Sequence, residues 1–188
     1  MKNIIIFASG SGSNAENIAQ YFTNNSNVKI QAVFTNNAQA GVIARMEKFN
    51  MPCVVFNRAE YKDEAFFLHQ INQYQPDLIV LAGFLWLVPT FLVHAFPNKI
   101  INIHPALLPK FGGKGMYGMH VHEAVKAANE TETGITIHYV NQHFDEGEPI
   151  FQAKVALTQT DTPDTIAHKI HDLEMTHFPK VIENLLLY

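Results

Sequence analysis

The chain has 188 residues, which is enough for one domain with a sizeable core, and a formal charge of −4 from 13 basic and 17 acidic residues. This balance argues against broad electrostatic binding of nucleic acid, which requires clustered Lys and Arg. The single cysteine, Cys53, excludes an intramolecular disulfide. No stretch approaches the roughly 20 apolar residues of a membrane span, and residues 3–8 are too short for the core of a signal peptide. We therefore expect a cytoplasmic protein with neither nucleic acid nor membrane as partner, either a monomer or a homodimer.

Apolar runs of strand length alternate along the chain with stretches of helical periodicity. Strands are expected at residues 4–8, 29–35, 53–56, 78–83, 99–104, 134–140 and 149–157. Helices are expected at residues 15–24, 40–49, 61–74, 122–129 and 162–187, the last with Asp161 or Thr162 as N-cap. This order predicts an α/β fold with a mostly parallel, doubly wound, Rossmann-like sheet, an antiparallel strand pair near the C-terminus and a long C-terminal helix, all in a single domain of residues 1–188.

A glycine-rich loop follows the first predicted strand, with the sequence Ser-Gly-Ser-Gly-Ser-Asn at residues 9–14. Glycines let a ligand approach the backbone closely, and the N-terminus of the next helix offers free N–H groups to a phosphate. No Lys-Ser/Thr pair follows as in a Walker A loop, and the third glycine of the dinucleotide fingerprint is missing. The pattern favours one phosphate over a dinucleotide, with a tight turn capped by Ser13 or Asn14 as the alternative.

The most informative stretch is the predicted strand end Asn102-Ile103-His104-Pro105. Because strand side chains alternate between faces, Asn102 and His104 point the same way. Pro105 cannot continue the ladder, so His104 is expected at the carboxyl end of its strand, where the ligands of such sheets bind. An amide and an imidazole side by side can hold a developing oxyanion and exchange protons with it. A capping Asn beside a half-buried core His is the alternative.

A second polar segment, Asp145-Glu146-Gly147, lies in the loop after the strand that carries His138. This loop can fold over the same end of the sheet and bring Asp145 near His104. Since a nearby carboxylate favours the charged form of an imidazole, we expect Asp145 to raise the pKa of His104 and to let it act as a general acid near neutrality. A plain hairpin turn is the alternative interpretation.

Ten histidines raise the question of a metal site. His120 and His122 can supply two ligands, but no third ligand is suggested at a regular spacing. Zinc sites use three or four protein ligands, so we expect no metal.

Taken together, three motifs resemble the glycinamide ribonucleotide formyltransferases of purine synthesis. They are the loop at residues 9–14, the string Asn-Ile-His-Pro-Ala-Leu-Leu-Pro at residues 102–109 with Leu-Ala-Gly-Phe at 81–84 before it, and Asp-Glu-Gly at 145–147. The resemblance spans nearly the whole chain. It implies an enzyme that moves the formyl group of its co-substrate 10-formyltetrahydrofolate to the amine of glycinamide ribonucleotide, by direct attack through a tetrahedral intermediate and without a metal.

The resemblance also implies roles for single residues. The catalytic trio is matched by Asn102, His104 and Asp145. Gly12, Ser13 and Asn14 match the family's loop that binds the phosphate of the acceptor substrate, and Glu174 matches an acid that contacts this substrate. The family's folate-binding positions are matched by the segment Leu85, Trp86, Leu87 and Val88, which holds the pterin, and by Asn102 and His138. Departures from the family pattern include Trp86, where many relatives carry Arg, and residues 112–118, which replace a shorter loop. Residues 110–120 are our candidate lid.

Other functions are compatible with parts of this pattern. Formyl transfer to initiator methionyl-tRNA uses a related site but is normally joined to a tRNA-binding domain, and the negative charge counts against it. A formyl-folate hydrolase normally carries an additional N-terminal regulatory domain. A non-catalytic nucleotide-binding module of flavodoxin-like shape would keep the glycine loop, but it has no use for a convergent Asn102, His104 and Asp145.

Overall fold

A computed structural model describes all residues, 1–188, as seven strands and seven helices. The strands are β1 (Lys2–Phe7), β2 (Val28–Thr35), β3 (Cys53–Val55), β4 (Leu78–Leu81), β5 (Ile100–His104), β6 (Glu132–Tyr139) and β7 (Pro149–Ala156). The helices are α1 (Ser13–Phe22), α2 (Gly41–Glu47), α3 (Arg58–Lys62), α4 (Glu64–Asn72), α5 (Thr90–Ala95), α6 (Met119–Ala127) and α7 (Pro163–Leu187). None of these helices is both long enough and apolar enough to cross a membrane.

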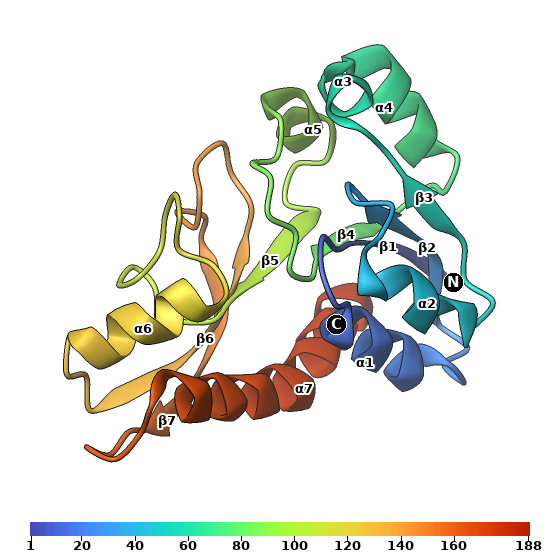
Figure 1. Cartoon of the computed structure of the whole chain (residues 1–188). Helices are drawn as coiled ribbons and strands as arrows, with labels where there is room; N and C mark the ends of the chain where they lie inside the picture. The colour runs from blue at the N-terminus through green and yellow to red at the C-terminus, as the bar shows by residue number, and fades with distance from the viewer.

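All seven strands form one sheet in the order β3-β2-β1-β4-β5-β6-β7 (Figure 1). The first five strands are parallel, while β6 runs antiparallel to β5 and β7 antiparallel to β6. This confirms the predicted doubly wound sheet with its antiparallel C-terminal pair and closing helix. The chain builds outward from β1 in one direction and then returns to β4, so the order reverses between β1 and β4. Ligands bind at such a reversal, beyond the carboxyl ends of the strands.

The two faces of the sheet have different cores because alternate strand residues point to opposite sides. One face is packed by aliphatic side chains from α1, α2, α6 and α7, with Ile4 and Ile6 of β1 at its centre. The other is packed by α3, α4 and α5 and is aromatic, with Phe7 of β1 stacked on Phe34 of β2 at 5.1 Å between ring centroids. Burial of each such side chain contributes about 1.5–3 kcal/mol.

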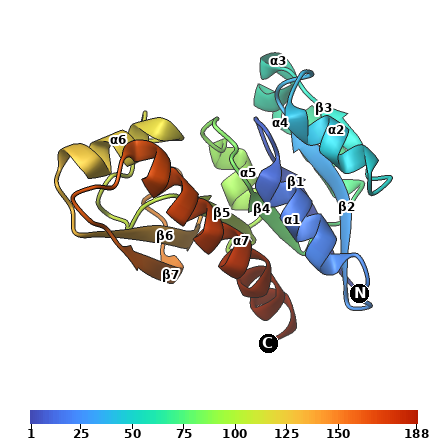
Figure 2. The same ribbon diagram turned by 60° about the horizontal axis from the view of Figure 1, so that its bottom comes forward.

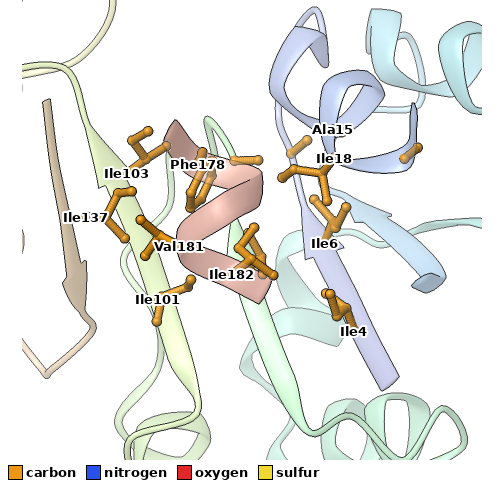
Figure 3. Packing of buried hydrophobic residues seen from close by; sticks show 14 of the residues in the cluster. Ile4, Ile6, Ala15, Ile18, Ile101, Ile103, Ile137, Phe178, Val181 and Ile182 are labelled. Atoms are coloured by element: carbon orange, nitrogen blue, oxygen red, sulfur yellow. The ribbon is translucent and has the colours of Figure 1, made fainter. Parts of the chain in front are cut away.

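Helix α7 joins the two halves of the aliphatic face. It lies across the sheet beside α1 (Figure 2). Its side chains Phe178, Val181 and Ile182 lie between two groups of isoleucines, one on β5 and β6 and the other on β1 and α1 (Figure 3). The packing of α7 therefore fixes the position of the end of β5 relative to the loop after β1.

A proline inside α7 adds a polar contact between α7 and α1. Pro179 has no N–H, so the carbonyl of Met175, four residues earlier, has no helical donor. The side-chain amide of Asn17 on α1 donates to this carbonyl at 2.9 Å. This contact sits one residue beyond Glu174, which faces α1 through Asn14.

The structure differs from the prediction at two places. The helix predicted at residues 61–74 is two helices, because Asp63 is extended (φ −79°, ψ 102°) and its carboxylate caps α4 by accepting from the Phe66 N–H at 3.0 Å. Helix α5 was not predicted at all, since its six residues are too few for a periodic pattern to show. The remaining elements agree with the prediction apart from shifts of their ends.

Candidate active site

The candidate catalytic side chains come from β5, β6 and the loop after β6. Asn102 and His104 share one side of β5, as their spacing predicts. Antiparallel pairing places His138 opposite Asn102 and Thr136 opposite His104. Thr136 Oγ1 donates to the Ala106 carbonyl at 2.7 Å and accepts from the Leu108 N–H at 3.0 Å, which holds the turn that follows His104.

The carboxylate of Asp145 lies between these side chains. It is 3.5 Å from His104 Nδ1 and 3.5 Å from Asn102 Nδ2, and its Oδ1 is 3.7 Å from His138 Nε2. Three of them are enclosed, with exposed side-chain fractions of 4% for His104, 3% for His138 and 11% for Asp145, while Asn102 is partly exposed. The structure thus brings together the predicted trio and His138 at one end of the sheet. Their chemical roles remain predictions.

The tautomer of His138 follows from its partners. Its Nδ1 lies 2.8 Å from the Tyr139 carbonyl, which can only accept, so Nδ1 carries the hydrogen. Its Nε2 is then an acceptor and takes a hydrogen bond from Asn102 Nδ2 at 3.1 Å. This arrangement orients the Asn102 amide, since its NH₂ group must face His138 and its oxygen must face away.

The glycine-rich segment after Pro109 contacts both His104 and Asp145. His104 Nε2 donates to the Phe111 carbonyl at 2.7 Å, and the Gly113 N–H donates to Asp145 Oδ2 at 2.9 Å. Gly112 packs closely as well, because a Cβ there would lie 3.2 Å from the Asp145 Cβ. Neither Phe111 nor Gly113 is predicted from the sequence as a contact of the site. The only signal was the glycine run, since both residues contribute backbone groups.

Asp145 acts to raise the pKa of His104, as expected, but the expected net rise is wrong. Burial, the largest effect, lowers the pKa of His104 below its ordinary value. The Asp145 carboxylate and the Phe111 carbonyl act in the opposite direction but are weaker. Burial also acts to raise the pKa of Asp145, yet its interactions with His138, His104 and the Gly113 N–H together hold it below its usual range. Asp145 is therefore ionised beside a His104 that is neutral at neutral pH.

The glycine loop after β1 forms the second part of the site. Gly12 is the N-cap of α1 and has φ 79°, a left-handed conformation that favours glycine. No side chain caps the helix, so Ser13 and Asn14 lie in its first turn and the capping alternative for them is wrong. The N–H groups of Gly10, Ser11 and Gly12 donate no hydrogen bond to another backbone group. They are available to an anion at the end of the sheet.

Asn14 and Glu174 meet at this loop, although they are far apart in the sequence. Asn14 Nδ2 donates to Glu174 Oε2 at 2.9 Å, while the Asn14 Oδ1 is buried without a partner. Burial raises the pKa of Glu174 to about 7, and the hydrogen bond from Asn14 opposes this shift only in part. A buried acceptor without a partner is costly, so Asn14 Oδ1 is suited to a ligand donor.

The segment after β4 lies next to the glycine loop. Ser9 joins the two, since its N–H donates to the Gly83 carbonyl at 3.0 Å and its Oγ accepts from the Leu85 N–H at 3.1 Å. The Leu87 carbonyl accepts from the Tyr61 hydroxyl at 3.2 Å, so two of the backbone groups of this segment already have partners. Leu85 and Leu87 are half-exposed, Val88 is buried, and the Trp86 ring has the Arg58 guanidinium 4.6 Å from its centroid.

A cavity of about 500 Å³ opens beside Asp145, between the turn at Leu108 and the loop from Phe144 to Gly147. This volume suits a small organic ligand. No group of three or more His, Cys, Asp or Glu side chains is placed to hold a metal ion. The site is thus an enclosed hydrogen-bonding corner next to a loop of free N–H groups, both at the carboxyl ends of the parallel strands.

Residues 2–182 match the protein family described as formyl transferase. The chain belongs to this family. One curated relative, the phosphoribosylglycinamide formyltransferase of Bacillus subtilis (strain 168), is 38% identical to this chain. The match covers 99% of this chain and 95% of that relative. The chloroplastic phosphoribosylglycinamide formyltransferase of Arabidopsis thaliana is 35% identical over 96% of the chain, which spans only 64% of that relative's length.

Solved structures agree with this membership. The crystal structure of phosphoribosylglycinamide formyltransferase from Bacillus Halodurans has a TM-score of 0.89 and 34% identity, over 99% of this chain and 96% of that one. The enzyme of the same name from Streptococcus pneumoniae TIGR4 has a TM-score of 0.87 and 32% identity, over 98% and 99%. The resemblance identified from three sequence motifs is confirmed, as is the fold class.

Proposed function

We propose that this protein transfers the formyl group of 10-formyltetrahydrofolate to the amine of glycinamide ribonucleotide, a step of purine biosynthesis. The observation that carries the proposal is the enclosed corner in which Asn102 and His104 both lie 3.5 Å from Asp145. The relatives named phosphoribosylglycinamide formyltransferase, which match nearly the whole chain, support the choice of acceptor.

Two positions are proposed for the substrates. Gly12, Ser13 and Asn14 bind the acceptor phosphate, which is supported by the free N–H groups of the loop. Glu174 contacts the same substrate, and the unpartnered Asn14 oxygen suits a donor of that substrate, such as a ribose hydroxyl, and not the phosphate itself. The pterin of the folate binds along Leu85–Val88 and reaches Asn102 and His138. Ser9 contacts both segments, so the two substrates would meet across it, near the end of β5.

The reaction follows from the donors of the corner. The acceptor amine attacks the formyl carbon, and the carbonyl oxygen becomes an oxyanion that accepts hydrogen bonds from His104 Nε2–H and from Asn102 Nδ2, which exchanges its long 3.5 Å contact with Asp145 for the oxyanion. Collapse of the tetrahedral intermediate breaks the bond between the carbon and the folate nitrogen. The amine gives up one proton and the folate nitrogen gains one, so the products are the formylated acceptor and tetrahydrofolate.

His104 is proposed to carry that proton, and Asp145 is proposed to stabilise the charged imidazolium. His104 holds one hydrogen on Nε2, and its Nδ1 faces the ionised Asp145 at 3.5 Å. A proton taken up at Nδ1 is stabilised by the carboxylate, which allows His104 to pass from neutral donor to imidazolium during the reaction. Because His104 Nε2 is hydrogen-bonded to the Phe111 carbonyl, residues 110–120 are proposed to move aside as a lid when the folate enters.

We also propose that residues 1–188 work as one domain in the cytoplasm, as a monomer or homodimer and without a metal. The function is tested with purified protein, 10-formyltetrahydrofolate and glycinamide ribonucleotide by following tetrahydrofolate release. Release is expected only when both substrates are present. Release with folate and water alone would identify a formyl-folate hydrolase, and release only with initiator methionyl-tRNA would identify the tRNA reaction; either result contradicts the proposal.

A further inference from the structure

One side chain reaches the glycine loop from a neighbouring helix. Arg45, on α2, donates from Nε to the carbonyl of Ser11 at 2.8 Å. Its Nη1 also pairs with Glu16 in the first turn of α1. Lys48, one turn of helix later, pairs with the same carboxylate at 2.8 Å but does not touch the loop. Arg45 thus contacts both the loop and the helix that the loop opens.

Helix α2 and the loop are in close backbone contact at this point. The Val42 N–H donates to the Gly10 carbonyl at 3.1 Å. A Cβ on Gly12 would come within 2.5 Å of the Val42 side chain, and a Cβ on Gly41 within 3.2 Å of the Ser11 carbonyl oxygen. Arg45 follows Gly41 by four residues and therefore lies on the same side of α2. The start of α2 packs against the loop, and Arg45 adds a side-chain hydrogen bond to this contact.

The hydrogen bond to Ser11 controls the direction of a neighbouring donor. A trans peptide group is planar, so its carbonyl and the N–H of the next residue point in opposite directions. By holding the Ser11 carbonyl, Arg45 fixes the orientation of the Gly12 N–H, which has no backbone acceptor. If that peptide turned over, a carbonyl oxygen would replace the N–H at the position offered to an anion. Gly12 lacks a Cβ and permits such a rotation.

We propose that Arg45 is a positioning residue for the phosphate of the acceptor, an inference that rests on the proposed function. It holds the peptide between Ser11 and Gly12 so that the Gly12 N–H faces the phosphate. It also balances the charge of Glu16, which would otherwise repel an anion at the start of α1. Arg45 acts through the loop and need not touch the substrate.

The test is steady-state kinetics of Arg45→Met with two acceptors, glycinamide ribonucleotide and its riboside without the phosphate. The KM for the ribonucleotide is expected to rise about ten-fold, the effect of one misdirected hydrogen bond to a charged group. The KM for the riboside, the KM for 10-formyltetrahydrofolate and kcat are expected to stay unchanged. A general loss of structure would change all four constants. Arg45→Ala serves as a second variant that removes the same two contacts.

Lys48→Met is the matched control, because Lys48 shares Glu16 with Arg45 but makes no contact with Ser11. It removes one of the two cations on Glu16 but leaves the Ser11 carbonyl held, so it is expected to raise the KM for the ribonucleotide clearly less than the Arg45 variants do. An equal rise in Lys48→Met, or no rise in either Arg45 variant, overturns the inference while the proposed function stands. If the wild-type protein has the same KM for the ribonucleotide and the riboside, the phosphate assignment of the loop itself fails.

Discussion

The glycine loop after β1 and the corner at the end of β5 lie at the same edge of the sheet but are built in opposite ways. The loop offers backbone N–H groups without backbone partners, and its shape depends on the left-handed Gly12. The corner consists of side chains that bond to one another, with His138, Asn102, Asp145 and His104 in one connected network. The loop is also more open, since Gly10 and Ser11 are exposed while His104 and His138 are buried.

This difference suits the loop to substrate binding and the corner to the chemical step. Backbone donors bind a fixed charge in the same way before and during the reaction, so changes in the loop are expected to alter the KM of the acceptor. Side chains in an enclosed corner act on charge that develops only during the reaction, so changes there are expected to alter kcat. Variants of each region sharpen or break this comparison.

The largest effect is expected from His104→Ala. The variant loses both the oxyanion donor and the proton carrier, and kcat is expected to fall roughly 10²–10⁴-fold. The KM for the acceptor should change little, because His104 is not part of the loop. His168→Ala, which removes an exposed histidine of α7, is the matched control and should keep the wild-type rate. Near-normal turnover of His104→Ala would remove His104 from the mechanism.

A smaller effect, on binding, is expected from Gly12→Val. The added Cβ meets Val42 at 2.5 Å, and φ 79° strains a β-branched residue at a cost of about 1–3 kcal/mol. The KM for the acceptor should therefore rise while the affinity for folate stays the same. Gly10→Ala tests whether any Cβ in the loop reduces stability, since a Cβ there has open space and no strain. If binding titrations show that folate affinity falls and acceptor affinity holds, the loop belongs to the other substrate.

Sequence patterns predicted the sheet and the residues that carry side-chain chemistry. Strand alternation put Asn102 and His104 on one side, and chain order put Asp145 at the same edge. The contacts of Phe111, Gly113 and Ser11 were not predictable, because each acts through a backbone group and any residue type has one. Arg45 was missed for a related reason, since only tertiary packing brings α2 to the loop.

The protonation of His104 was also beyond the reach of sequence. The sign of the Asp145 effect follows from charge alone and was predicted. The net shift depends on how deeply the imidazole is buried, which is decided by the segment from Leu108 to Gly113 and by β6. Burial outweighs the carboxylate, so the net pKa of His104 falls where a rise was expected.

Asp145→Asn tests the effect of the carboxylate charge on His104. Asn tolerates the positive φ of 57° at this position, so the backbone should be retained. Removing the carboxylate removes the largest effect that favours imidazolium, and the pKa of His104 is expected to fall further below its ordinary value. The rate at neutral pH should drop by about ten-fold, which is less than the roughly 10²–10⁴-fold expected for loss of a general acid–base group, because His104 itself is retained. An NMR titration in which the His104 pKa does not move would contradict the pairing.

The smallest effect concerns Glu174, a partly buried side chain of α7 that contacts the loop through Asn14 and does not touch the corner. Its folded-state pKa of about 7 lies above the ordinary value of 4.5, so the folded state binds the proton more tightly than the unfolded state. The stabilisation is fully present below pH 4.5 and is lost as the pH rises toward 7, because the unfolded chain releases its proton first. Glu174→Gln keeps an acceptor for Asn14 Nδ2 and cannot ionise. Urea unfolding should therefore show the wild type losing about 1–3 kcal/mol relative to Glu174→Gln over this range. Parallel pH profiles of the two proteins would mean that Glu174 is more solvated than its position against Asn14 indicates, and the loop would then have no desolvated carboxyl group beside it.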